Sequence, residues 1–198
     1  MKIMQAPSFY HWSEIRTSGG SIHPNDGFTA IELMVVVAIV ATLTALAGPS
    51  FRPLIERWRV RDTAESLTAT LYLARSEAIK RGGNVTINMN PPTCANSTSS
   101  TGWGCGWTVR HTDGAVTTDL QASTEPTRVD IALTGSTGSI TVDRWGMMAH
   151  KSGAGPGAPT NLAFTITPGG KPNTDISAAR LCAGSGGRIV RKKGTETC

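Results

Sequence analysis

The sequence predicts an α+β protein in which a long N-terminal helix packs on an antiparallel β-sheet head. Apolar residues recur with helical spacing up to about residue 82, and short segments that alternate apolar and polar residues follow. A helix followed by a run of strands is typical of this class. We therefore divide the chain into four parts, which are residues 1–27, 28–48, 49–82 and 83–198.

The first part of the predicted helix is a candidate membrane span. Residues 1–27 are expected to be a leader, and the 21 residues Phe28–Gly48 that follow carry a single charge, Glu32. About 20 apolar residues are enough to cross a bilayer as a helix. Pro49 comes next and should bend or interrupt the helix, because proline has no N–H to donate.

The second part, residues 49–82, has an amphipathic pattern that Gly82-Gly83 should end. Five apolar residues recur at three- and four-residue intervals and should face the core: Ala64, Leu67, Leu71, Ala74 and Ala78. A helix from residue 28 to about residue 81 would measure about 80 Å. Since a head of about 115 residues cannot bury such a rod, part of it must lie in lipid or against other subunits.

The head should contain seven short strands, and we expect them to form one sheet. They are Asn84–Met89, Trp107–His111, Thr127–Leu133, Ser139–Trp145, Asn161–Thr167, Ala179–Ala183 and Arg188–Lys192. Asp113-Gly114 predicts a hairpin turn. Trp103 and Trp107 are expected to cover the sheet, with ligand stacking as the alternative.

Four cysteines fall in two local couples, Cys94 with Cys105 and Cys182 with Cys198. Four cysteines allow three sets of disulfides, and the sequence leaves the choice open. We favour nearest-neighbour pairing because each couple brackets a stretch rich in Gly, Ser and Thr; free thiols in a cytosolic protein are the alternative. Zinc binding is disfavoured because there is no CxxC pair. Disulfides would place the head in an oxidising compartment.

The distribution of arginines argues against an exported head. Only Lys2 and Arg16 precede the apolar run, and four arginines follow it closely: Arg52, Arg57, Arg59 and Arg61. By the positive-inside rule the head would stay in the cytoplasm. We favour export nevertheless, because long domains cross membranes largely regardless of their charge.

Glu32 is the most informative residue of the apolar run. A carboxylate inside a membrane helix is costly and is a functional hypothesis by default. A free amine would be a suitable partner, and cleavage between Gly27 and Phe28 would create one. Two other interpretations stay open: a secretory signal peptide cut at Ala45-Leu46-Ala47, and a plain signal anchor.

Gly27-Phe28-Thr29, Glu32-Leu33 and the long apolar run resemble the type III signal of type IV prepilins and type II secretion pseudopilins. Pro49 stands where these helices often carry a proline. The resemblance implies a pilin-like fold and a prepilin peptidase that cuts after Gly27 and methylates the Phe28 amine. It also implies that Glu32 assists subunit docking by pairing with a terminal amine.

Other stretches resemble the GspH/FimT-like family of minor pilins and H-type pseudopilins. They include Leu67–Lys80, Gly102–Val109, Leu181-Cys182 and Gly187-Arg188-Ile189-Val190-Arg191. The resemblance implies a subunit that initiates or caps a type IV pilus or a type II secretion pseudopilus. It also implies a single-pass inner-membrane protein with a periplasmic head, whose partners are the peptidase, membrane lipid and other major and minor pilins or pseudopilins.

The chain shows no catalytic constellation, so we expect no enzyme activity, cofactor or metal. Its net charge is +5, and five cationic residues lie in the last 19: Arg180, Arg188, Arg191, Lys192 and Lys193. Some members of the resembling family are DNA receptors that use Gly-Arg-x-Arg, but Gly187–Arg191 is one residue longer. On a strand Arg188 and Arg191 should face opposite sides, and Arg188 and Lys192 the same side. We favour a solvated basic edge that discourages aggregation, with a DNA-binding receptor for natural transformation as the alternative.

Overall fold

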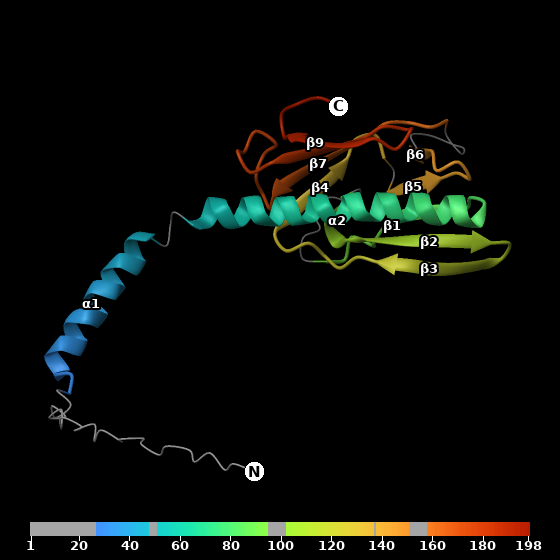
Figure 1. The fold of residues 1–198 in the computed structure, drawn as a ribbon. Helices are drawn as coiled ribbons and strands as arrows, with labels where there is room; N and C mark the ends of the chain where they lie inside the picture. The colour runs from blue at the N-terminus through green and yellow to red at the C-terminus, as the bar shows by residue number, and fades with distance from the viewer. Residues whose placement is uncertain (1–26, 48–50, 95–101, 137, 151–157) are drawn as a thin grey trace, which may run out of the picture. The chain divides into compact units, whose positions relative to one another are not determined.

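The computed structural model describes residues 27–47, 51–94, 102–136, 138–150 and 158–198 (Figure 1). It divides into two compact units, residues 1–45 and 46–198, and each is described by itself. The predicted leader, apart from Gly27, and Pro49 lie outside the described residues.

Most of the described residues of the N-terminal unit belong to helix α1, Ala30–Ala47. Thr29 caps it, since its hydroxyl accepts a hydrogen bond from the Glu32 N–H (3.3 Å) and its carbonyl accepts one from the Leu33 N–H (3.2 Å). The side chains from Ala30 to Leu46 are all exposed within this chain. None of the helices in the described ranges combines the length and the apolar character that crossing a membrane requires.

The head is organised around helix α2, Arg52–Arg81, whose 30 residues span about 45 Å. The helix ends where predicted, because Gly82 adopts a left-handed conformation (φ 81°) and the Gly83 N–H donates to the Ala78 carbonyl (2.8 Å). The core face is also confirmed, since the five predicted residues are buried together with Val60, Thr63 and Thr70.

The strands form two antiparallel sheets rather than the single sheet expected. The first has the order β3-β2-β1-β5-β6, with β1 Val85–Met89, β2 Trp107–Asp113, β3 Val116–Ala122, β5 Ser139–Val142 and β6 Met148–His150. The second has the order β4-β7-β8-β9, with β4 Val129–Leu133, β7 Leu162–Pro168, β8 Ala179–Ala183 and β9 Ile189–Lys193.

Helix α2 lies across both sheets and contacts strands of each (Figure 1). The two sheets can therefore bury their apolar faces in one shared core with the helix. The Asp113-Gly114 turn joins β2 and β3, as predicted. Sequence reasoning missed β3 and β6: β3 is exposed along nearly its whole length, and β6 has only three residues, so neither shows an alternating pattern.

Both predicted tryptophans lie in the core, Trp103 at the start of a short 3-10 helix, η2 (Trp103–Cys105), and Trp107 at the start of β2. The Trp103 and Phe164 rings meet edge-to-face at 5.6 Å between centroids. The Trp107 indole N–H donates to the Thr70 hydroxyl (2.9 Å). At 0% and 1% exposure, Trp103 and Trp107 have no free face for ligand stacking, so their role is structural.

Candidate functional site

The predicted processing and assembly residues lie at the start of α1. Phe28 is 87% exposed, and a Cβ added at Gly27 would meet no atom within 4 Å. Glu32 lies in the first turn, where the helix dipole favours a negative charge. Within the described residues its carboxylate forms no ion pair, so any cationic partner has to come from outside them.

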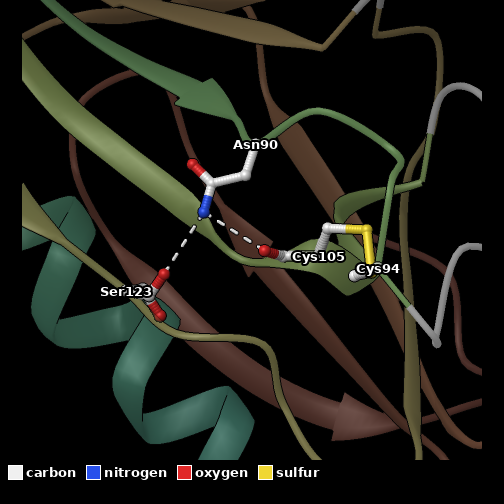
Figure 2. Close-up of a disulfide and its surroundings, with 4 residues drawn as sticks. All are labelled: Asn90, Cys94, Cys105 and Ser123. Carbon is white, nitrogen blue, oxygen red and sulfur yellow. Dashed lines mark hydrogen bonds between the residues drawn. A yellow bond between two sulfur atoms is a disulfide. The ribbon is translucent and has the colours of Figure 1, made fainter.

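The first disulfide joins Cys94 to Cys105 and so fixes the segment before β2 (Figure 2). Asn90 reinforces it: the side-chain amide donates to the carbonyls of Cys105 (3.1 Å) and Ser123 (3.3 Å). Gly106 is required here, because a Cβ would lie 2.6 Å from the Ser123 carbonyl and its φ is +84°.

The second disulfide joins Cys182 of β8 to Cys198, the nearest-neighbour pairing that we favoured. It ties the C-terminal segment to the second sheet. The Lys192 ammonium donates to the Thr197 carbonyl (2.7 Å), and the Gly194 N–H donates to the Ala178 carbonyl (3.1 Å). The basic C-terminal region is therefore a closed lobe rather than a loose tail.

The five cationic residues of this lobe do not form one patch. In the β8–β9 pairing Arg180 lies opposite Lys192, whereas Arg191 lies opposite the buried Leu181 and Lys193 opposite the buried Ala179. Because side chains alternate across a sheet, Arg180 and Lys192 point away from the core while Arg191 and Lys193 share the core-facing side. The sheet thus separates Arg180 from Arg191 and Lys193, although Lys192 also lines a hollow of about 450 Å³ together with Arg191 and Lys193.

Arg188 and Lys192 both line a hollow of about 260 Å³ beside the second disulfide. This agrees with the expectation that these two residues share a side. Arg191 instead reaches the α2 side, where its guanidinium lies 3.9 Å from the Glu65 carboxylate. The pKa of Glu65 is held below its ordinary value, first by a hydrogen bond from Arg61 and also by the charges of Arg61 and Arg191.

Arg180 is less available than its sequence position suggests. It is half-buried, and one of its terminal nitrogens donates to the Thr165 hydroxyl (3.3 Å). Its Nε atom is buried and forms no hydrogen bond in the described structure. Arg180 therefore contributes more to the sheet surface than to a phosphate-binding face.

Arg75 is a positioning residue that sequence reasoning missed. It extends from α2 and donates to the Gly186 carbonyl in the β8–β9 turn (3.0 Å). A Cβ at Gly187 would fall 1.2 Å from its guanidinium, and a Cβ at Gly146 would fall 2.6 Å from its Cγ. These glycines are the signal that could have indicated a close neighbour, and Arg75 fixes the turn that presents Arg188.

The described residues hold no group of three or more His, Cys, Asp or Glu side chains arranged to bind a metal ion. One further hollow, of about 430 Å³, lies between α2 and the segment 123–127. It is lined by the polar residues Arg59, Asp62 and Ser66 and by the edge of Trp107, and nothing in it is arranged as a nucleophile with a base.

Comparisons with known proteins agree with this architecture. The crystal structure of the type IV minor pilin FimU of Pseudomonas aeruginosa (strain PAO1) matches with a TM-score of 0.53 at 22% identity, over 71% of this chain and 92% of FimU. The minor pseudopilin EpsH of the Vibrio cholerae type 2 secretion system gives a TM-score of 0.43 at 15% identity, over 71% of this chain and 99% of EpsH. The first similarity shows a shared fold, and the second is too low to carry an argument.

No protein of curated function is significantly similar to the chain in sequence. The family model described as type II transport protein GspH matches residues 63–191, which cover α2 from its first buried turns to the last strand. The predicted family is confirmed: the chain belongs to the GspH family of type II transport proteins and has the fold of a minor pilin.

Proposed function

We propose that this protein is a minor pseudopilin or pilin subunit that is cleaved after Gly27 and then built into a filament, which it initiates or caps. The observation that carries the proposal is Glu32, a carboxylate in the first turn of an otherwise uncharged apolar helix, with no ion-pair partner among the described residues. A new amine at Phe28, on this subunit or on a neighbour, would neutralise it.

Membrane insertion precedes assembly in this proposal. The apolar run Phe28–Gly48 is inserted into the inner membrane, and the head is exported to the periplasm, where both disulfides can form. A prepilin peptidase removes the leader and methylates the Phe28 amine. The exposed side chains of α1 then leave their contacts with lipid and pack against α1 of neighbouring subunits. Small residues favour this step, because they let helices approach closely.

The first experiment is mass spectrometry of the chain purified from membranes that contain a prepilin peptidase. We expect a mature N-terminus at Phe28 with one added methyl group. An unprocessed chain, or cleavage after Ala47, would contradict the proposal, since the latter would indicate a secretory signal peptide.

The second experiment replaces Glu32 by Gln, which keeps the size and removes the charge. Incorporation into filaments should fall at least tenfold, because the neighbouring amine then has no counter-charge in lipid. Asp113→Asn is the matched control: it also removes one carboxylate, but at an exposed hairpin turn of the head, and should assemble normally. Equal incorporation of the two variants would reject the docking role of Glu32.

A second candidate function is DNA uptake, favoured by the position of Arg188 and Lys192 around one hollow on a disulfide-closed lobe. Both could contact phosphates without reading sequence. A head comprising residues 51–198 should then bind duplex DNA at low salt and lose affinity as salt rises. Arg188→Ala and Lys192→Ala should weaken binding, whereas Arg191→Ala, on the other side of the sheet, should not. No salt-sensitive binding would exclude this function.

A further inference from the structure

The first turns of α2 expose an apolar strip that the head does not use. Phe51, Leu54, Ile55 and Trp58 recur at helical spacing, and their exposed fractions are 54%, 49%, 47% and 64%. With about 3.6 residues per turn, these four side chains fall on one side of the helix. Val60, the first core residue of α2, falls on the opposite side, so the strip faces away from the sheets.

Four arginines border this strip: Arg52, Arg57 and Arg61 are exposed, and Arg59 is half-buried. By the same helical spacing, Arg52 and Arg59 lie along one edge of the strip, and Arg57 and Arg61 lie along the other. We name residues 51–61 the collar. An apolar face with basic residues along both edges is typical of helices that lie in a membrane interface.

The acidic residues near the collar are largely engaged elsewhere. Glu56 points to the head side and accepts a hydrogen bond from the Lys171 ammonium (2.6 Å). Glu65 is held by Arg61 (2.7 Å) and lies near Arg191. Asp62 and Glu65 both lie just beyond the collar on the strip's own side, and both are exposed. Because Glu56 pairs with Lys171 and Glu65 pairs with Arg61, the positive charge of the collar is carried mainly by Arg52, Arg57 and Arg59.

The occupant of the collar follows from its charge and from its place in the chain. Phe51 comes three residues after Gly48, the last residue of the apolar run, so the collar begins within about 10 Å of the end of that run. If the run lies in the bilayer, as the proposed function requires, the collar lies at the level of the lipid headgroups. Tryptophan and arginine are favoured at that level, and arginine is attracted to anionic lipid.

We propose that the collar binds anionic phospholipid headgroups and so sets the height of the head above the membrane before assembly. The proposal also accounts for the arginines that run against the positive-inside rule, because they serve as lipid ligands on the exported side. It rests on the proposed membrane insertion of residues 28–48 but not on peptidase cleavage or on Glu32.

The test uses the head alone, residues 51–198. Every residue of the hydrophobic core lies at or beyond Val60 and both disulfides lie within this fragment, so it keeps its whole core. We expect the fragment to co-sediment with vesicles of phosphatidylglycerol and phosphatidylcholine, and not with vesicles of phosphatidylcholine alone. Binding should weaken as salt rises.

The key variant is Arg52→Gln/Arg57→Gln/Arg59→Gln. Each lost charge should weaken vesicle binding roughly fivefold, so the three together should weaken it roughly a hundredfold. The matched control, Arg110→Gln/Arg128→Gln/Arg144→Gln, removes the same charge from exposed positions of the head and should bind within about threefold of the parent. Equal losses in the two variants would show general attraction by a basic protein and would overturn the proposal.

Two exposed tryptophans provide a second measurement. Trp58 in the collar is 64% exposed and Trp145 in the β5–β6 turn is 68% exposed. Lipid-borne quenchers should reduce fluorescence in the parent and in Trp145→Ala, and much less in Trp58→Ala. Lipid is rejected as the occupant if the fragment binds no vesicle. If, in addition, the triple collar variant of the full chain fails to enter filaments, the occupant is a protein subunit. The Glu32 experiment is independent, because the fragment lacks that residue.

Discussion

The two parts of helix α2 use their apolar residues in opposite ways. From Val60 to Ala78 they form a stripe that is buried against both sheets, and Leu67 is 1% exposed. From Phe51 to Trp58 they lie on the other side and are about half exposed or more. The head therefore completes its own core without the first turns of the helix, and the apolar residues there are free for the external contact that we propose.

The largest expected difference between the two parts is in stability. Leu67→Ala should lower the free energy of unfolding of the head by about 2–5 kcal/mol, because it leaves a cavity in a closed core. Leu54→Ala removes the same atoms from an exposed site and should change the free energy of unfolding by about 0.5 kcal/mol or less. Urea titration of both variants measures the contrast. Similar losses would show that the collar is part of the core.

A smaller effect is expected at the turn that Arg75 holds against the core part of α2. Gly187→Ala should cost about 1–3 kcal/mol, because φ is +91° and a Cβ would collide with the Arg75 guanidinium. Gly186→Ala, where a Cβ meets nothing within 4 Å, is the control and should cost little. Adding Arg75→Ala to Gly187→Ala should recover part of the loss in a double-mutant cycle. An additive result would mean that the clash is not the cause.

The smallest effect concerns the link between the first turns and the head, where Lys171 joins Glu56 (2.6 Å) and Asp175 (3.4 Å). The Ser177 N–H, and then Lys171, lower the pKa of Asp175 below its ordinary value of 3.8. Its stabilising contribution is therefore complete above about pH 4 and is lost as pH falls through the lowered pKa.

Asp175→Asn should therefore reduce the loss of stability that occurs as pH falls below about 4, and leave the dependence of stability on pH unchanged above that value. Thermal unfolding of the head between about pH 2 and pH 7 measures this. If the parent and the variant lose stability equally at acid pH, other carboxylates dominate that loss. Glu65 and Glu77 are the candidates, because Arg61 and Arg81 lower their pKa values.

Much of the fold could be predicted from local pattern. The spacing of Leu67, Leu71 and Ala74 identified the core face of α2, and Gly82-Gly83 identified its end, because helical periodicity and a left-handed glycine are properties of neighbouring residues. The hairpin at Asp113-Gly114 was found for the same reason. The strand β3 was missed because its side chains are exposed on both faces and so carry no alternation.

The candidate site was only partly predictable. The sequence singled out Arg188 and Lys192 as sharing a side, since strand parity is local. It could not show that Arg180 is half-buried against Thr165 or that Arg191 reaches Glu65, because both depend on which strand and helix lie beside β9.

The sequence by itself determined the family, the buried stripe of α2 and the end of that helix at Gly82-Gly83, all of which depend on residues close together in the chain. Only the tertiary structure decided that the strands divide into two sheets, that Arg191 reaches Glu65, and that Arg75 holds a turn 111 residues away. The physical reason is that long-range packing chooses among registers and neighbours that are equally compatible with local pattern.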